Sequence, residues 1–273
     1  MELDSPAVRD AVQSLASQAL PAFGIALLLL LFAVWGLWRL VQRYGVHRET
    51  SRFPALAYLV AYLALGFGLI TGAASLFAEI AENLGDGRKL GQLDLLFSDT
   101  LRATLSGSAV RVFALLTHLG DPVTLTGLGI AGVLALLWQR RYWLCAGWVL
   151  AIGGNAVLNP VLKNIFERAR PLHENGQALA DGWSFPSGHA SSSVVVYGML
   201  AYVLVRLLPE RYAAVRLPVV LLTAALAFTV GCSRIFIRVH FASDVLAGFA
   251  SGMAWLAVCI VAIELARYRL RTA

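Results

Sequence analysis

Apolar runs of the length that crosses a lipid bilayer recur along the whole chain, and they constrain the fold more than any other feature. A transmembrane helix needs about 20 consecutive, mainly apolar residues. Such runs lie at 20–41, 54–78, 120–138, 142–164, 188–207, 215–234 and 244–264. Apolar residues make up 59% of the chain and charged residues only 14%, which excludes an ordinary soluble domain. We therefore predict an all-α fold, a polytopic helical membrane protein.

The arginines predict which ends of these spans face the cytoplasm, because short cytoplasmic loops are enriched in positive charge. They gather between spans one and two, three and four, five and six, and after span seven: Arg39, Arg43, Arg48, Arg52, Arg140, Arg141, Arg206, Arg211, Arg216, Arg267, Arg269 and Arg271. This pattern predicts an outer N-terminus and an inner C-terminus. Segments 79–119, 165–187 and 235–243 then share the outer face.

Three amphipathic stretches have the pattern of helices that lie along a membrane surface. The opening stretch SPAVRDAVQSLASQAL starts with a Ser-Pro pair and repeats apolar residues at helical spacing. Segment 79–119 contains two more, DLLFSDTLRATL and GSAVRVFALLTHLGD. We expect all three on the outer side. The first apolar run lacks a basic cluster before it and a small-residue cleavage site after it, so we interpret it as a retained helix.

The net charge of +6 does not indicate a nucleic-acid partner. The basic residues are divided among loops that flank the spans, and they form no continuous basic face. The cysteines Cys145, Cys232 and Cys259 lie in or beside apolar spans without the spacing of metal ligands. We interpret them as packing residues.

The stretch KNIFERARP, at the outer end of the fourth span, holds charges that are costly near a bilayer. Lys163 and Arg170 are seven residues apart, so on one helix face they would lie about 10 Å apart along the axis. Pro171 is expected to end this helix. Asn155 and Asn159 extend the polar face inward. Alternatively, the cations only snorkel at a helix end, where the helix dipole favours them. Positive charge is unusual at an outer end, which favours a functional site.

The stretch FPSGHASSS, residues 185–193, precedes the fifth span. Ser187 has the character of a helix N-cap, and Gly188 helps to shape the tight turn before the helix. The free backbone N–H groups of a first helical turn, together with the helix dipole, bind anions. His189 lies in the same turn, where it is placed to donate a proton to a bound oxyanion. Alternatively, the stretch is an ordinary cap with an incidental histidine. In either case the serines that follow, 191–193, are expected to pack the helix rather than to act as catalysts.

The stretch SRIFIRVHFASD, residues 233–244, lies between the last two spans. Arg234 ends the sixth span. His240 and Asp244 are four residues apart, so the carboxylate can reach the imidazole if the segment is helical, and this would make the other ring nitrogen a better nucleophile or base. Alternatively, Asp244 caps the last span and His240 is merely interfacial. Arg238 is either a further cation of the site or a headgroup contact.

Together these stretches supply the groups that phosphoryl transfer requires. Fixed positive charge would hold the phosphate oxygens, one histidine would attack in line, and the other would protonate the leaving oxygen. The sequence has no P-loop motif and no His, Cys or carboxylate group with metal-ligand spacing. We infer metal-independent chemistry through a phosphohistidine.

These residues resemble the signature of the type 2 phosphatidic acid phosphatase superfamily, which includes lipid phosphate phosphatases and is related to vanadium haloperoxidases. Its motifs are K-x6-R-P, P-S-G-H and S-R-x5-H-x3-D. In this chain they stand, in the same order and spacing, as Lys163 to Arg170-Pro171, Pro186-Ser187-Gly188-His189, and Ser233-Arg234 to His240 to Asp244. The resemblance covers roughly residues 54–264.

The resemblance implies a role for each of these residues. His240 would be the nucleophile, Asp244 would orient it, and His189 would protonate the leaving group. The phosphate would be bound by Lys163, Arg170, Ser187, Gly188 and Arg234. No metal or other cofactor is implied. The family core has six spans, so residues 1–50 would form a surface helix and an additional span, and residues 51–273 the membrane-embedded phosphatase domain.

We therefore expect a bacterial inner-membrane lipid phosphatase with its site on the periplasmic or extracytoplasmic face. Candidate substrates are undecaprenyl pyrophosphate, phosphatidylglycerophosphate, phosphatidic acid and lipid A phosphates. Segment 172–185, with Glu174 and Asp181, and the helices of 79–119 are expected to select among them. Alternatives are a lipid phosphotransferase or a haloperoxidase with the same site, and an anion transporter, which would need charges near the bilayer midplane. Nothing in the sequence indicates an oligomeric state.

Overall fold

The structure is a computed structural model that describes residues 6–45, 55–84, 88–171 and 181–272. Every regular element in these ranges is a helix, which confirms the all-α prediction. The α-helices are α1 (Pro6–Ser17), α2 (Ala19–Leu40), α3 (Ala55–Glu82), α4 (Lys89–Thr104), α5 (Gly107–Leu116), α6 (Pro122–Trp138), α7 (Tyr142–Phe166), α8 (Gly188–Leu207), α9 (Ala213–Phe236) and α10 (Ala242–Thr272). Short helical turns are η1 (Val41–Gly45), η2 (Thr117–Gly120) and η3 (Glu210–Tyr212).

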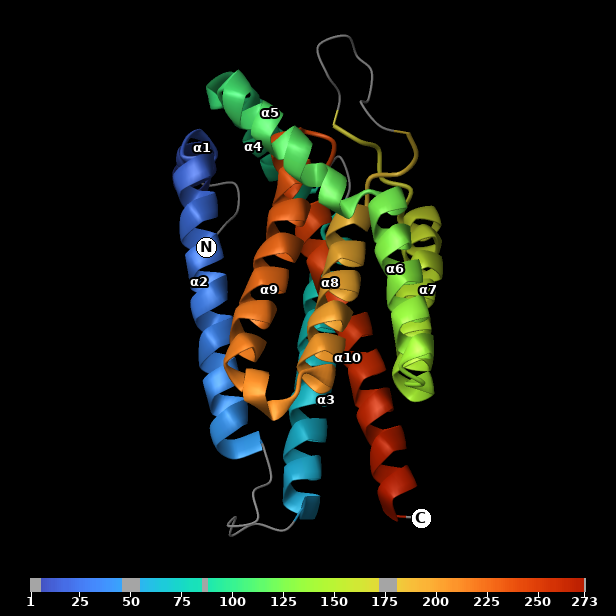
Figure 1. The fold of residues 1–273 in the computed structure, drawn as a ribbon. Helices are drawn as coiled ribbons and strands as arrows, with labels where there is room; N and C mark the ends of the chain where they lie inside the picture. The colour runs from blue at the N-terminus through green and yellow to red at the C-terminus, as the bar shows by residue number, and fades with distance from the viewer. Residues whose placement is uncertain (1–5, 46–54, 85–87, 172–180, 273) are drawn as a thin grey trace.

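The described residues contain seven helical stretches that are long and apolar enough to cross a membrane, as predicted. They are Ala19–Arg43, Leu63–Glu82, Gly107–Trp138, Tyr142–Phe166, Gly188–Leu207, Glu210–Phe236 and Ala242–Tyr268. The third stretch is longer than the predicted run at 120–138, because the apolar helix α5 continues through η2 into α6. Figure 1 shows α5 leaning across one end of the bundle, whereas α6 runs along it.

The long helices form one bundle around α8, which packs against α6, α7, α9 and α10 (Figure 1). Helix α3 packs along α10, and α2 lies on the outside of the bundle against α9. Helices α1, α4 and α5 gather at one end, where α1 packs on α4. The predicted amphipathic segments are therefore helices at a single end of the molecule. The last turns of α10 lie at the opposite end.

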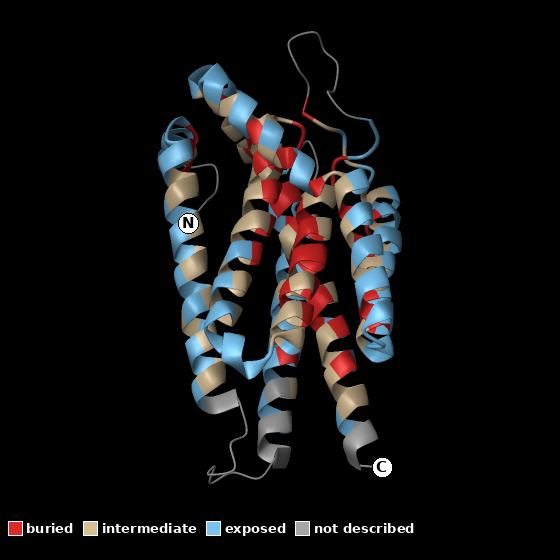
Figure 2. Cartoon of the chain, in the orientation of Figure 1, coloured by how far each residue is buried: buried red, intermediate tan, exposed pale blue. Residues whose placement is uncertain are grey.

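Burial is highest on α8 and lowest on α2. Figure 2 shows buried residues concentrated on the central helices and at the end that carries α4 and α5. Large apolar side chains on α2, such as Leu28, Leu29 and Phe32, are instead exposed. Apolar surface of this kind is stable against lipid chains, and the helix satisfies its own backbone hydrogen bonds there. The bundle thus has an interior core and a lipid-facing surface.

Helices α8 and α10 approach each other unusually closely at the end that carries α4 and α5. The sequence G-x-x-x-G in α10 places Gly248 and Gly252 against the start of α8. A Cβ atom at Gly248 would lie 2.6 Å from the carbonyl oxygen of Ser187, and one at Gly252 would lie 2.7 Å from that of Ser191. The motif therefore serves close helix packing. The helix it contacts is the one that begins at the P-S-G-H sequence.

One local prediction was wrong, because α7 does not continue to Pro171. It ends at Phe166, and Glu167 adopts a left-handed conformation with a φ of 45°. The chain then turns, and Ser184 donates its backbone N–H to the carbonyl oxygen of Arg168 at 2.8 Å. Lys163 and Arg170 consequently do not share a helix face. They reach the same region from two different backbone segments.

Candidate active site

The three charged segments converge at the end of the bundle that carries α4 and α5 (Figure 1). Backbone hydrogen bonds connect the second segment with the third and brace the third internally. Ser187 donates its N–H to the carbonyl oxygen of Asp244 at 2.9 Å, and His240 donates its N–H to that of Arg234 at 3.3 Å. The start of α8, the end of α9 and the start of α10 are therefore fixed to one another. The predicted site residues from all three sequence motifs meet here.

His240 is almost completely buried, with both ring nitrogens in contact with other side chains. Arg170 Nη1 lies 3.2 Å from His240 Nε2, and since an arginine can only donate, Nε2 is the acceptor nitrogen. On the other side of the ring, Nδ1 lies 3.5 Å from Asp244 Oδ2 and 3.3 Å from Ser184 Oγ. The imidazole therefore carries its proton on Nδ1. Its Nε2 lone pair points to the cationic part of the site.

The protonation of His240 suits a nucleophile. Burial is the largest cause that lowers the pKa of His240; the charges of Arg170 and Lys163 act in the same direction and Asp244 opposes them, so that the pKa is about 4. The ring is consequently neutral at neutral pH, so Nε2 keeps the lone pair that a nucleophile needs.

The sequence left open whether Asp244 orients His240 or caps the last span, and in the structure it does both. Its Oδ2 accepts the backbone N–H of Phe241 at 2.9 Å, which caps the start of α10. The same oxygen accepts the hydroxyl of Ser184, which in turn lies against the imidazole of His240. The segment 237–241 before α10 is not helical. Asp244 reaches His240 because the chain turns sharply there, rather than along one helix face.

The cations surround the Nε2 side of His240. Lys163 Nζ donates to the carbonyl oxygen of Trp183 at 2.6 Å, and Arg170 Nε donates to that of Gly182 at 2.9 Å. Lys163 interacts electrostatically with Arg170 and Arg234. Arg234 donates through Nη1 to Thr117 at 2.9 Å, while its buried Nε has no partner among the described residues. Three cations thus form one positive cluster with donors still free.

The start of α8 has the predicted geometry of an anion-binding helix end. Ser187 is buried and caps α8, its hydroxyl accepting the backbone N–H of Ala190 at 3.5 Å. Gly188 lies so close to Asn159 that a Cβ atom would be 3.0 Å from its side-chain oxygen. The serines that follow pack the helix, as expected: Ser191 donates to Asn155, and Asn155 donates to Ser192, both at 3.0 Å.

His189 has a carboxylate partner that the sequence analysis missed. Its Nε2 lies 3.0 Å from Asp121 Oδ1, and the other oxygen of Asp121 lies 2.7 Å from His118 Nδ1. Asp121 precedes α6, in a stretch that the sequence marked only as amphipathic. His189 also interacts electrostatically with Arg234 and Lys163. Asp121 fixes the orientation of His189 at the edge of the cation cluster.

Arg168 is a second residue that the sequence analysis missed. Its Nη1 donates to Asp244 Oδ1 at 2.6 Å and to Ser243 at 2.7 Å, and its Nη2 donates to Asp94 Oδ2 at 2.8 Å. Asp94 lies on α4 and also accepts the backbone N–H and the hydroxyl of Ser243. Burial raises the pKa of Asp94, against the opposing charge of Arg168. A buried chain of charges thus links α4 to Asp244, and through it to His240.

Replacing Arg168 by methionine is expected to lower kcat about 100-fold with little change in KM. The substitution leaves two buried carboxylates without their cation, which costs roughly 3–5 kcal/mol for a broken buried pair, and it frees Asp244 to move away from His240. Arg168→Lys should lose less, because it retains the charge but cannot bond both carboxylates at once. Steady-state kinetics on purified protein measure both effects.

Arg102→Met is the matched control for this experiment, because Arg102 is an exposed arginine at the end of α4. Its kcat and KM should equal those of the unaltered protein. A purely structural role for Arg168 would instead reduce the fraction of folded enzyme without changing kcat per active molecule, as determined by titration of active sites.

The structure also bears on segment 172–185, Arg238, the cysteines and possible metal ligands. Most of the predicted selectivity segment, including Glu174, lies outside the described residues, whereas Asp181 is exposed and interacts electrostatically with Arg170. Arg238 adopts a left-handed conformation with a φ of 57°. The cysteines are free thiols within the helical bundle, as predicted for packing residues. Among the described residues, no group of three or more His, Cys, Asp or Glu is placed to hold a metal ion.

Comparison with known proteins agrees with this fold. The family model of the PAP2 superfamily matches residues 142–268, which contain all three sequence motifs. Phosphatidylglycerophosphatase B of Bacillus subtilis (strain 168) is 35% identical over 143 residues, which are 50% of this chain and 67% of that protein. Decaprenylphosphoryl-5-phosphoribose phosphatase of Mycobacterium tuberculosis (strain H37Rv) is 34% identical over 128 residues, 46% of this chain and 63% of that protein.

A solved structure extends the similarity to the fold. The crystal structure of the transmembrane PAP2 type phosphatidylglycerolphosphate phosphatase from Bacillus subtilis superposes with a TM-score of 0.66 at 28% identity. The superposition covers 72% of this chain and 96% of the Bacillus subtilis chain. A helical membrane bundle with this site defines a membrane phosphatase. The chain belongs to the PAP2 superfamily, as one of its membrane lipid phosphatases.

Proposed function

We propose that this chain hydrolyses the terminal phosphomonoester of a glycerophospholipid through a phosphohistidine on His240, with phosphatidylglycerophosphate as the first candidate substrate. The observation that carries the proposal is the contact of 3.2 Å between Arg170 Nη1 and His240 Nε2. It directs the lone pair of a neutral, buried histidine at a group that binds phosphate oxygens well. The ring is held from behind by Ser184 and Asp244.

The reaction would proceed in two steps. His240 Nε2 attacks phosphorus, so that a P–N bond forms while the P–O bond to the lipid breaks, and His189 gives a proton to the leaving oxygen. Water then attacks phosphorus, His189 takes its proton, and the P–N bond breaks to release inorganic phosphate. Lys163, Arg170 and Arg234 would hold the phosphate oxygens, together with Ser187 and the backbone N–H groups at Gly188. Side chains thus supply the positive charge, and the proposal requires no metal ion.

A cavity of about 300 Å³ beside His189 supports a polar leaving group. It lies between α6, α7 and α8, and Leu125, Ile152 and Val195 contribute apolar walls. Asn159 also lines it, and its buried side-chain Nδ2 has no partner among the described residues. A buried donor without a partner is costly, and an ester or hydroxyl oxygen next to the phosphate would satisfy it. This favours a glycerol-based leaving group over a purely apolar one.

We also propose on which side of the membrane the active site lies. The arginine-rich loops predict that the end with the active site faces the extracytoplasmic side, the periplasmic side of a bacterial inner membrane. Residues 1–50 would then add a surface helix and one span to a phosphatase domain of residues 51–273. Membrane embedding also favours a substrate whose lipid tails stay in the bilayer.

Phosphate release from a panel of lipids, measured on detergent-solubilised protein with EDTA present, tests the proposal. We expect the highest kcat/KM for phosphatidylglycerophosphate, lower values for phosphatidic acid, undecaprenyl pyrophosphate and lipid A phosphates, and no effect of EDTA. Loss of activity in EDTA would contradict the metal-independent mechanism. Product analysis with added lipid alcohols distinguishes hydrolysis from the alternative phosphotransferase, which would form a new phospholipid instead of free phosphate.

A further inference from the structure

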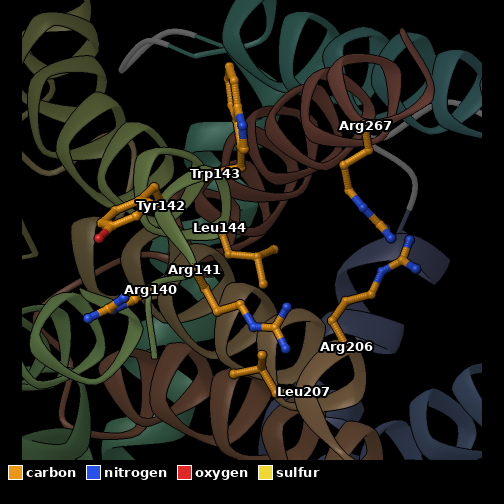
Figure 3. Close-up of a pocket in the computed structure, with 8 residues that line it drawn as sticks. All are labelled: Arg140, Arg141, Tyr142, Trp143, Leu144, Arg206, Leu207 and Arg267. Carbon is orange, nitrogen blue, oxygen red and sulfur yellow. The ribbon is translucent and has the colours of Figure 1, made fainter. Parts of the chain in front are cut away.

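The end of the bundle opposite the active site contains a second cavity, of about 380 Å³ (Figure 3). Three parts of the chain form it: the turn before α7 and its first residues, the end of α8, and the last turns of α10. Its lining residues are Arg140, Arg141, Tyr142, Trp143, Leu144, Arg206, Leu207 and Arg267. We call it the arginine pocket.

The arginine pocket is far from the active site. Arg206 and His189 lie on the same helix, α8, seventeen positions apart. At a rise of 1.5 Å per residue this corresponds to about 26 Å, close to the thickness of the hydrocarbon core of a bilayer. A lipid headgroup in the active site therefore cannot occupy the arginine pocket. The two cavities lie toward opposite ends of the bundle.

The arginine pocket is strongly positive. Glu264 on α10 accepts hydrogen bonds from Arg206 and from Arg267, and it also accepts the hydroxyl of Tyr202. Arg140 and Arg141 have no carboxylate partner among the described residues. Four guanidinium groups thus share one carboxylate, which leaves three positive charges uncompensated at a membrane surface.

The walls of the arginine pocket suit a molecule that is anionic at one end and apolar at the other. Figure 3 shows Arg141 close to Leu144 and Leu207, with Arg206 and Arg267 on the other side of the pocket from Arg140. Trp143 is largely exposed beside these arginines, a position that aromatic side chains favour at a membrane interface. Arg206 and Arg267 converge and Arg141 lies across from them, whereas Arg140 points away (Figure 3). Apolar and aromatic groups next to these guanidinium groups match the boundary between acyl chains and phosphate headgroups.

Arginines that only determine topology need no such convergence. Arg39 is exposed on α2 and Arg211 is exposed in η3, both at the same end of the bundle, and neither lines the arginine pocket. We propose that the arginine pocket binds the phosphodiester headgroup of an anionic phospholipid from the leaflet opposite the active site, which the arginine distribution predicts to be the cytoplasmic leaflet. Bidentate arginine contacts would hold the phosphate, and an acyl chain would lie against Leu144 and Leu207.

The experiment compares lipid retention by the full chain and a pocket variant, Arg140→Gln with Arg141→Gln. Neither arginine bonds Glu264, so the substitutions leave no unpaired carboxylate behind. Each protein is reconstituted in nanodiscs of phosphatidylglycerol and phosphatidylcholine and then released into mild detergent, and bound lipid is counted by native mass spectrometry. Phosphatidylglycerol is used because it carries no phosphomonoester for the active site. We expect the unaltered protein to retain phosphatidylglycerol selectively and the pocket variant to retain about tenfold less.

A double variant that removes the same charge outside the pocket, Arg39→Gln with Arg211→Gln, is the matched control and should retain phosphatidylglycerol as the unaltered protein does. Equal losses in both double variants would show that net charge alone attracts the lipid, and would overturn the proposal. Retention of phosphatidylglycerol by the pocket variant at the level of the unaltered protein would also overturn the proposal. Displacement of the lipid by millimolar inorganic phosphate would indicate a site for free anions instead. If the pocket variant does not fold, Arg141→Gln and Arg141→Lys replace it; the first should lose most of the lipid, and the second, which keeps the charge without the bidentate contact, should lose less.

Discussion

His240→Asn is expected to lower kcat for lipid phosphate hydrolysis by about 10⁴-fold or more, the scale of effect seen when an enzyme loses its nucleophile. Asparagine retains a polar side chain in the buried space but has no lone pair on nitrogen with which to attack phosphorus. KM should change little, because the cations that hold the phosphate remain in place. The measurement is phosphate release under saturating substrate, combined with rapid quenching of radiolabelled substrate.

The labelled phospho-enzyme provides the sharper readout. The unaltered protein should carry label that survives an alkaline quench and disappears in acid, as phosphohistidine does, and His240→Asn should carry none. His47→Asn makes the same chemical change in the predicted loop between the first two spans and should retain both label and activity. If His240→Asn kept more than a tenth of the activity, the phosphohistidine mechanism would be wrong.

His189→Asn is expected to lower kcat by about 10²–10⁴-fold on lipid substrates, the range of general acid–base catalysis. The substitution removes the proton donor for the leaving alkoxide and the base for the incoming water. It should leave the positive cluster of Lys163, Arg170 and Arg234 intact. KM should therefore stay close to that of the unaltered protein.

A substrate with a good leaving group separates the two functions of His189. An aryl phosphate needs no proton on its leaving oxygen, so His189→Asn should still form the phospho-enzyme from it at nearly the normal rate. Hydrolysis of that intermediate would remain slow. Labelled phospho-enzyme should therefore accumulate, and the released phenol should appear as an initial burst. An equally large defect in the first step with lipid and aryl phosphates would contradict the assignment of His189 as the general acid.

The sequence predicted the bundle well because the bilayer imposes a strong and simple constraint. Each span must be a helix of nearly fixed length, so composition alone locates it. The three family motifs selected the site residues, although the shared helix faces expected for Lys163 with Arg170 and for His240 with Asp244 are absent. Lys163, Arg170, Ser187, Arg234 and His240 do converge in the structure. Their catalytic roles remain predictions for the experiments above.

The residues that support the site were not predictable from local spacing. Asp94 and Arg168 are 74 positions apart, and His189 and Asp121 are 68 apart, so only the tertiary fold brings each pair together. Both carboxylates lie in or beside helices that the sequence described only as amphipathic. A charged residue on the apolar side of such a helix was the available signal. The end of α7 was misplaced because nothing in ERARP marks Glu167 for a left-handed conformation.

The glycines of α10 also determine in which direction a substrate can extend. Backbone contacts with Gly248 and Gly252 hold one side of the first turns of α8, so the start of this helix, where we propose that phosphate binds, cannot move towards α10. The other side of the same turns borders the cavity between α6 and α7. A bulkier headgroup must therefore be accommodated on the α6–α7 side, and changes in lipid preference within this architecture should map to residues of those two helices.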